Sequence, residues 1–220
     1  MYSDRRVVIH LHGRVMKVSK AQAQANREHV VRTASAVFRE RGYDGVGVVD
    51  LMAAAGFTHG GFYKQFQSKA ELMAESAACG IAQTAAQTAS LSALDFARFY
   101  LSRAHRDAPG MGCTMAALGG DAARQTQAVR AAFADGVEQL MAALNLQGTS
   151  LEHAAPDERR ARCLDIFARA VGAIVMSRAC PDDSPLADEI LTVCLREIEA
   201  ALAPAAPSSP LPSARGRRRP

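Results

Sequence analysis

Apolar residues recur every three or four positions along most of the chain, which is the spacing of α-helices with one buried face. In the segment 21–41, Val30, Ala34 and Phe38 fall on a single face, and Gly42 follows where a helix commonly ends. Runs of β-branched residues are short and are always followed by helix-forming residues. The pattern predicts an all-α protein.

Two short helices are predicted after this first long one. The first covers about residues 48–55 and stops at Gly56, and Thr58 can cap a second that runs to about Gln65. Phe62 and Phe66 then face inward against Leu51, Ala54 and Phe57. Two short helices joined by a turn of three or four residues that contains glycine form a helix-turn-helix.

The same periodicity predicts about nine helices in all. Those after the helix-turn-helix cover about residues 69–90, 92–107, 113–118, 122–144, 157–180 and 186–202. The last two have apolar faces wider than a one-sided surface helix requires. Either they are central core helices or they are buried a second time against another copy of the chain.

Charge is distributed unevenly over the chain. Residues 1–69 carry 11 Lys and Arg against 5 Asp and Glu, residues 70–203 carry 11 against 17, and residues 204–220 carry 4 Arg and no acid. A basic end is typical of proteins that meet nucleic acid, although a solvated basic face without a partner has the same composition. The combined patterns predict a basic arm at 1–20, a helix-turn-helix domain at 21–68, a larger helical domain at 69–203 and a disordered Pro-rich tail at 204–220.

The five cysteines are odd in number and widely spaced, with no Cys-X-X-Cys pair and no Cys/His cluster. We therefore expect reduced thiols in a cytoplasmic protein, with no metal and no cofactor. Cys79, Cys163, Cys180 and Cys194 are interpreted as core residues on apolar helix faces. No nucleophile elbow, zinc-protease motif, P-loop or carboxylate pair is present, so we do not expect an enzyme.

The segments "FRERGYDG", "VVDLMAAAG" and "THGGFYKQFQSKAEL" resemble the N-terminal DNA-binding domain of the tetracycline-repressor (TetR) family of bacterial regulators. The resemblance covers about residues 21–73. It implies a helix-turn-helix domain followed by a helical domain that binds a ligand and forms a homodimer, here through the helices at 157–180 and 186–202.

The predicted recognition helix suggests which residues contact DNA, because the first residues of such a helix lie nearest the base edges of a major groove. Thr58 and the free N–H groups beside it can bind a phosphate. His59 and Gln65 can read bases, and two glycines let the backbone approach the duplex. Nine residues form the predicted interface: Thr58, His59, Gly60, Gly61, Tyr63, Lys64, Gln65, Lys69 and Lys20.

The segment "GCTMAALGGD" resembles regulators close to the N-ethylmaleimide-responsive repressor, in some of which a cysteine at the start of the sixth helix senses electrophiles or oxidants. Cys113 is the corresponding thiol, and a helix N-terminus stabilises a thiolate. The sequence favours the alternative, an inert core thiol, because cysteines are among the most buried residues. The other expected inducer is an apolar molecule in a cavity of the second domain, although the same residues are an equally good ordinary core. The residues in question are Phe96, Phe99, Tyr100, Met111, Met115, Phe133, Met141 and Phe167.

The sequence as a whole predicts a transcriptional regulator, a repressor that binds a palindromic operator as a homodimer and leaves it when a small molecule binds or a cysteine is modified. One alternative is an architectural DNA-binding protein without an inducer. The other is a thiol enzyme on Cys113, for which His105 is the only base nearby in the sequence.

Overall fold

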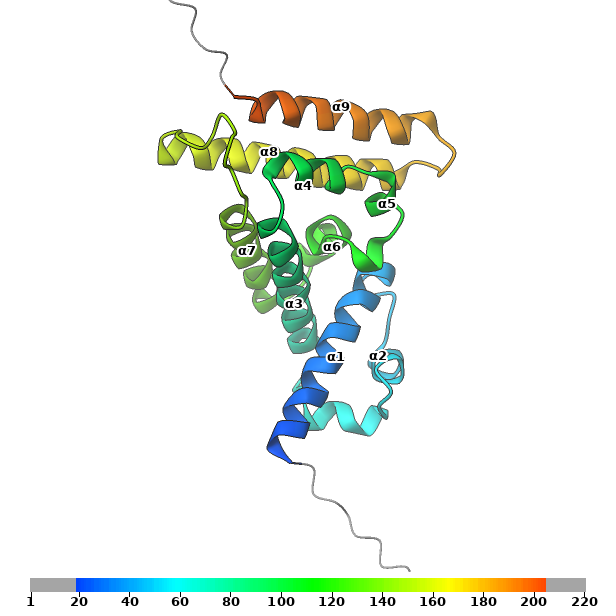
Figure 1. The fold of residues 1–220 in the computed structure, drawn as a ribbon. Coiled ribbons are helices and arrows are strands. Elements are labelled where there is room, and N and C mark those ends of the chain that lie inside the picture. Colours follow the sequence, from blue (N-terminus) through cyan, green and yellow to red (C-terminus); the bar gives the residue numbers. More distant parts are fainter. Residues whose placement is uncertain (1–18, 205–220) are drawn as a thin grey trace, which may run out of the picture.

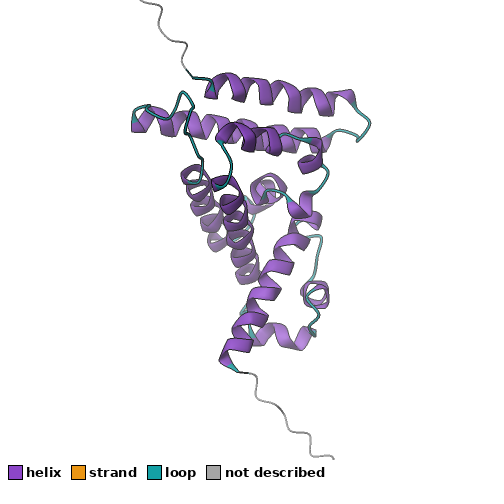
Figure 2. Cartoon of the chain, viewed as in Figure 1, coloured by secondary structure: helices purple, strands orange, loops and turns teal. Residues whose placement is uncertain are grey.

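The computed structural model describes residues 19–204, and every regular element within this range is a helix (Figure 2). The expected all-α class is confirmed. The described part has nine α-helices, α1 to α9, and two short 3₁₀ helices, η1 and η2. Nearly all of the predicted basic arm (1–20) and of the predicted tail (204–220) lies outside the described residues.

The N-terminal end of the molecule consists of α1 (Lys20–Arg41), α2 (Val48–Ala54) and η1 (His59–Lys64) (Figure 1). The hydroxyl of Ser19 caps α1 by accepting the N–H of Gln22 at 3.1 Å. Gly42 ends α1 with φ of +74°, a conformation that glycine adopts without strain, as the sequence predicted. Gly56 likewise ends α2, with φ of +76°.

The remaining helices are α3 (Lys69–Ala89), α4 (Ala93–Tyr100), α5 (Arg103–Arg106), η2 (Pro109–Met111), α6 (Thr114–Ala122), α7 (Gln127–Ala142), α8 (Pro156–Ala179) and α9 (Pro185–Leu202). Figure 1 shows α3 and α7 side by side, while α8 and α9 lie across the end of the molecule that is farthest from η1. The order of the helices agrees with the prediction apart from the short 3₁₀ helix η2, which was not predicted, and from two places where the boundaries differ.

The single helix expected at 92–107 is interrupted after Tyr100. Leu101 has ψ of 29°, which turns the chain out of the helix, and the hydroxyl of Ser102 caps α5 by accepting the N–H of His105. Serine competes well for a cap position because its side chain replaces a missing helical hydrogen bond. The periodicity of the apolar residues continues across the break, so it gave no sign of it.

The boundary between the helices at 113–118 and 122–144 was also predicted wrongly. Gly119 and Gly120 do not end α6, which continues to Ala122, and α7 begins only at Gln127 after Thr126. A glycine at a helix end is favoured mainly where φ is positive. Neither of these two glycines has positive φ.

Buried apolar side chains form one continuous core that extends from Phe38 and Phe62 in the N-terminal helices to Leu191 and Ile198 of α9. Asp121 of α6 adds a polar link, because its carboxylate accepts the N–H of Tyr43 in the loop after α1 at 3.2 Å. The helix-turn-helix is thus packed onto the rest of the chain.

No helix of the described residues is long and apolar enough to cross a membrane.

We predict opposite effects for two Gly→Ala changes inside helices. At Gly136 of α7 a Cβ would lie 2.4 Å from Cδ1 of Ile81 in α3, whereas at Gly120 of α6 it would meet nothing within 4 Å. Gly136→Ala should lower the free energy of unfolding by about 1–2 kcal/mol because it overpacks the α3–α7 contact. Gly120→Ala, the control, should raise it by up to about 1 kcal/mol. Urea unfolding of both variants measures the difference, and equal effects would contradict the close packing.

Candidate functional site

The short helix η1 is held by two aromatic side chains on its inner face. Phe62 and Phe66 are both buried, and their rings stack with centroids 5.5 Å apart. The prediction that they face inward is confirmed. One predicted neighbour was wrong, because Ala54 is exposed and Ala55 is the alanine that is buried at the end of α2.

The outer face of η1 carries side chains that nothing covers. Tyr63 is 68% exposed, Thr58, His59 and Lys64 are also exposed, and the rings of His59 and Tyr63 meet edge to face. Thr58 occupies the N-cap position without making the predicted side-chain cap hydrogen bond. Its hydroxyl therefore does not stabilise the helix in the way that the sequence suggested.

The two glycines at the start of η1 leave this face bare. A Cβ at Gly60 would meet nothing within 4 Å, and a Cβ at Gly61 would make only an ordinary contact, 3.5 Å, with Cε of Met52. Neither glycine has positive φ. Internal packing and backbone conformation therefore give no reason for glycine at position 60.

Lys69 and Gln65 lie differently from the other predicted contact residues. Nζ of Lys69 donates to the carbonyl of Tyr43 and lies 6.0 Å from the ring centroid of Phe38. Oε1 of Gln65 is buried without a hydrogen-bond partner among the described residues. Both side chains point toward the scaffold in this structure, so contact with another molecule would require them to turn outward.

Lys20 lies near η1 although it is far away in the sequence. An open groove of about 560 Å³ separates the first turns of α1 from the end of η1, and its lining includes Lys20, Arg27, Lys64 and Gln65. The structure thus brings three basic side chains to one end of the helix-turn-helix. The two lysines are exposed, and Arg27 is partly buried.

Arg27, which the sequence indicated either as a contact with the DNA backbone or as a solvated side chain, is a scaffold residue in the structure. It donates to the carbonyl of Gln65 and to the carboxylates of Glu71, at 2.9 Å, and Glu75. Its guanidinium also lies 4.1 Å from the ring centroid of Phe66. Because these partners are about 40 to 50 positions away in the chain, only the folded structure reveals that Arg27 joins α1, η1 and α3.

Glu71 completes this junction. Its Oε2 accepts the N–H of Gln67 at 2.6 Å, while its own N–H donates to Oγ of Ser68, the predicted cap of α3, at 3.2 Å. The hydrogen bond from Gln67, assisted by Arg27, lowers the pKa of the Glu71 carboxyl. The charged form of Glu71 therefore stabilises the segment that follows η1.

Cys113 lies at a second junction, between η2 and α6. It occupies the N-cap of α6, as the sequence suggested, but only 2% of it is exposed. Its backbone N–H donates to Nε2 of His105 at 3.1 Å. The hydroxyl of Tyr100 is buried without a hydrogen-bond partner among the described residues. Burial is the main cause that raises the pKa of Tyr100, and the adjacent Cys113 raises it further.

His105 is fixed as a neutral ring by its two hydrogen bonds. Since Nε2 accepts from Cys113, the proton is on Nδ1, which donates to the carbonyl of Tyr100 at 2.6 Å. Burial lowers the pKa of His105 further. Neither ring nitrogen is free to take a proton from the Cys113 thiol.

Most of the residues predicted to line a ligand cavity do not line one in the structure. Phe99 is 49% exposed and Met111 still more, whereas Met115 and Phe133 are buried in the core rather than around the cavity. An apolar cavity lies instead between α4, α8 and α9. Of the residues predicted to line a ligand cavity, Phe96, Tyr100 and Phe167 line it, together with Cys163. Its volume is about 40 Å³, enough for a few water molecules.

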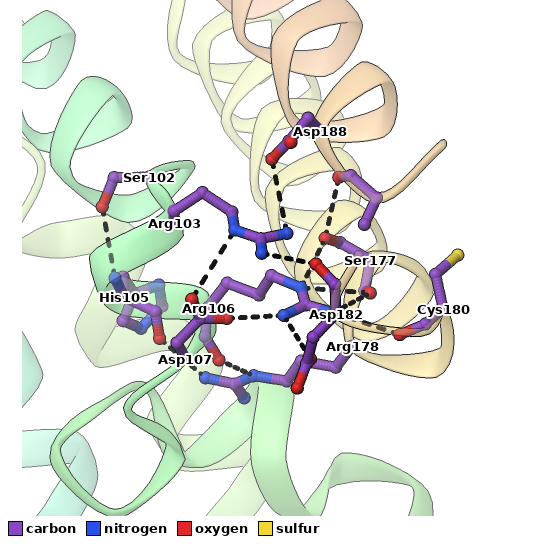
Figure 3. Close-up of polar contacts among 11 residues, drawn as sticks. Ser102, Arg103, His105, Arg106, Asp107, Ser177, Arg178, Cys180, Asp182 and Asp188 are labelled. Atoms are coloured by element: carbon purple, nitrogen blue, oxygen red, sulfur yellow. Dashed lines mark hydrogen bonds and ion pairs between the residues drawn. The ribbon is translucent and has the colours of Figure 1, made fainter. Parts of the chain in front are cut away.

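A network of arginines connects the segment before Cys113 to α8 and α9 (Figure 3). Arg106, which is 3% exposed, donates to the carbonyl of Ser177 at 3.0 Å and to Asp182 at 2.9 Å. Arg178 of α8 donates to the carbonyls of His105 and Arg106. Cys180, predicted as a core thiol, instead ends α8 and is only partly buried.

The other cysteines predicted to be core residues differ among themselves. Cys163 is buried, whereas Cys79 and Cys194 are only partly buried. Within the described part of the chain, no group of three His, Cys, Asp or Glu residues could hold a metal ion.

Comparisons with known proteins concern mainly the N-terminal helices. Residues 30–75 match the sequence model of the bacterial regulatory proteins of the tetR family. Over 43 residues, 20% of this chain, the sequence is 49% identical to the HTH-type transcriptional repressor DhaR of Mycobacterium sp. (strain GP1). This match spans 22% of the length of DhaR.

Solved structures extend the similarity in fold to most of the chain. The reduced form of NemR from E. coli superposes with a TM-score of 0.67 and 20% identity, covering 83% of this chain and 100% of NemR. A TetR-family regulator from Cytophaga hutchinsonii gives a TM-score of 0.63 and 17% identity, covering 84% and 98%. At this level of identity the similarity concerns the fold.

The junction around Arg27 predicts a pH-dependent effect of Glu71→Gln. A carboxyl whose pKa is lowered by folding stabilises the protein above its unfolded-state pKa, about 4.3, and this stabilisation is lost as the pH falls through the folded-state pKa. The change should lower the free energy of unfolding by about 1 kcal/mol at neutral pH, since the site is partly exposed, and by much less near pH 3. Glu189→Gln, at an exposed position of α9, is the control. Urea unfolding at both pH values is the measurement. A pH-independent loss would contradict the role of the charge.

Proposed function

We propose that this chain, whose N-terminal domain belongs to the tetR family of bacterial regulatory proteins, is a DNA-binding transcriptional repressor. The observation that carries the proposal is the outer face of η1. Its side chains are exposed, its inner face is fixed, and its glycines have no packing role in the free protein. A rigid, bare and basic helix end is suited to close approach to a duplex.

The contacts with DNA divide into two kinds. The exposed hydroxyls of Thr58 and Tyr63 and the charges of Lys64 and Lys20 contact phosphates and fix the register of the helix. His59 projects from the first turn, where base edges are within reach. Gly60 and Gly61 bring the backbone close to the duplex. Gln65 and Lys69 contribute only after their side chains have turned outward.

The repressor acts as a homodimer, with each copy contributing one η1 to a palindromic operator. The support is the exposed apolar surface of the two C-terminal helices, which includes Leu164, Val175 and Met176 of α8 and Leu186 and Val193 of α9. A two-fold dimer through this surface would present its recognition helices to major grooves one helical turn apart, about 34–36 Å.

The working division of the chain is a DNA-binding domain at 21–68 and a ligand-binding and dimerisation domain at 69–203, acting in the cytoplasm. The chain path supports a boundary near Ser68, because the side chain of Ser68 caps α3 immediately after η1. The continuous core supports mechanical coupling of the two domains.

Release from DNA follows a change in the second domain, for which two inducers are proposed. One is a small apolar molecule that enlarges the cavity beside Tyr100. The other is an oxidant or electrophile that modifies Cys113. With hypochlorous acid the thiol R–SH becomes R–SOH, while the chlorine is reduced to chloride and a proton is released. The added oxygen would enter a buried site beside the unpartnered hydroxyl of Tyr100.

The alternatives have less support. A thiol enzyme on Cys113 needs a base, and both nitrogens of His105 are already engaged. An architectural protein without an inducer would bind DNA equally well with and without modification, so the release experiments decide between it and the repressor.

For DNA binding we predict a selective effect of Gly60→Ala. In the free protein the added methyl meets nothing, so stability should be unchanged or rise by up to about 1 kcal/mol. Against a closely approached duplex it should weaken binding about tenfold, which corresponds to about 1.4 kcal/mol. Gel retardation on the DNA flanking the coding region, with thermal unfolding in parallel, measures both.

Two further variants make this experiment specific. Tyr63→Phe removes only an exposed hydroxyl and should weaken binding while leaving the fold intact. Gly120→Ala, remote from η1, should bind like the unchanged protein. Absence of any retarded band at low salt would refute the proposed function, whereas equal binding by Gly60→Ala would refute only the close approach of the backbone.

For the sensor we predict that Cys113→Ser retains operator binding but is no longer released by hypochlorite. Cys163→Ser, which removes a buried thiol at the apolar cavity, is the matched control and should be released like the unchanged protein. The measurement is the retarded fraction after a short treatment followed by quenching. If Cys113→Ser is released as readily as the control, Cys113 is not the sensor and the apolar inducer is favoured.

A further inference from the structure

The side chain of Arg39 lies buried where α1, α3 and η2 meet. Its Nε and Nη2 donate to the carbonyl of Gly110 at 3.0 and 2.7 Å, and Nη1 donates to the hydroxyl of Ser35 at 2.7 Å and that of Thr114 at 3.4 Å. All of these acceptors are neutral. No carboxylate among the described residues forms an ion pair with this guanidinium, although only 8% of Arg39 is exposed.

Gly80 of α3 leaves the space that the guanidinium of Arg39 occupies. A Cβ at Gly80 of α3 would lie 2.4 Å from Nη1 of Arg39, so only glycine permits the arginine to pass. Glycine inside a helix destabilises it relative to alanine. Burial lowers the pKa of the Arg39 guanidinium, and the attraction of its neighbours, among them the exposed carboxylate of Glu40, only partly offsets this. A charge buried without a counterion is costly unless something compensates it.

A groove of about 350 Å³ opens over Arg39. One wall of the groove is formed by Arg32, Ala36 and Arg39 of α1. The other wall is formed by residues of α3, namely Gly80, Gln83, Thr84 and Gln87. Met111 and Gly112 also line the groove. No acidic residue lines the groove. The guanidinium of Arg32 is exposed and has no hydrogen bond or ion pair with any residue that the structure describes.

We propose that this groove binds a small oxyanion, either a phosphate or a carboxylate attached to a short apolar group. Arg32 contacts the anion directly, and the amide of Gln87 donates a hydrogen bond to it. The amide of Gln83, which donates to Sγ of Cys79 at 3.7 Å in this structure, joins after it turns toward the groove. Arg39 supplies positive charge from the floor of the groove, where partial burial screens it less than a charge on the open surface. Met111, which is largely exposed, offers apolar contact to the rest of the ligand.

The groove is separate from the candidate DNA contacts. Arg39 lies in the last turn of α1, whereas Lys20, which belongs to the proposed DNA surface, begins that helix. The groove is also separate from the apolar cavity between α4, α8 and α9. An anion bound here would bridge α1 of the helix-turn-helix to α3, so it is placed to affect their relative orientation.

Thermal unfolding with inorganic phosphate, at an ionic strength held constant with chloride, tests the site without DNA. A ligand that binds only the folded chain and is present at about ten times its dissociation constant should raise the Tm by about 3–5 °C. Sodium butyrate in the same assay tests the carboxylate. A rise with phosphate alone identifies a phosphate site, and a rise with butyrate alone identifies a carboxylate site.

Arg32→Gln is the decisive variant, because Arg32 is exposed and its replacement leaves the fold intact. It should bind the effective anion at least about tenfold more weakly, as expected for a lost charge-assisted contact. Arg130→Gln, at an exposed position of α7, is the control and should behave like the unchanged protein. Arg39→Met should also lose binding, and if it fails to fold, Arg32→Gln still decides.

The proposal is overturned if neither anion raises the Tm, or if Arg32→Gln and Arg130→Gln respond alike, which would indicate a general salt effect. Broadening of the phosphorus NMR signal of phosphate by the unchanged protein, and not by Arg32→Gln, provides an independent check where phosphate is the effective anion. Since no step uses DNA, failure of this site leaves the proposed repressor function unaffected.

Discussion

The recognition segment depends for its shape on Phe62 and Phe66, because six residues that include two glycines cannot form a stable helix alone. Their stacked rings bury the inner face of η1, and Arg27 binds the carbonyl of Gln65 at its end while covering Phe66. The outer face of η1 is then not needed to stabilise the fold. A surface held in this way can be bare, since its rigidity comes from the residues beneath it rather than from its own contacts.

The inner face of η1 could be predicted from the sequence because it obeys a local rule. Apolar residues four positions apart, a glycine that stops α2 and a serine that caps α3 are all written within a few residues of one another. The same kind of rule failed at Leu101, where a break interrupts a helix whose apolar periodicity continues. It also failed at Gly119 and Gly120, which resemble a helix end but lie inside α6.

The junctions between helices could not be predicted, because their partners are distant in the sequence. Arg27 reaches Glu75, Arg39 reaches Gly110 and Arg106 reaches Ser177, each across more than forty positions. An arginine on a helix face is usually solvated, so composition alone favours the wrong interpretation. The prediction of the ligand-binding residues was largely wrong for a related reason. Aromatic and methionine side chains mark apolar surface in general, and only packing decides that Phe99 is exposed while Phe96 lines a cavity.

The two proposed inducers make different demands on this architecture. An apolar inducer needs a cavity of some hundreds of Å³, so it must separate α4 from α8 and α9 before it is bound, and the work of opening reduces its affinity. Modification of Cys113 needs only a brief opening that admits the oxidant to the buried thiol, and the added oxygen is then held covalently in the packed site. That site adjoins Thr114, which accepts a hydrogen bond from Arg39, and Arg39 belongs to the helix that positions η1. Of the two routes, the covalent one acts nearer to the DNA-binding helices.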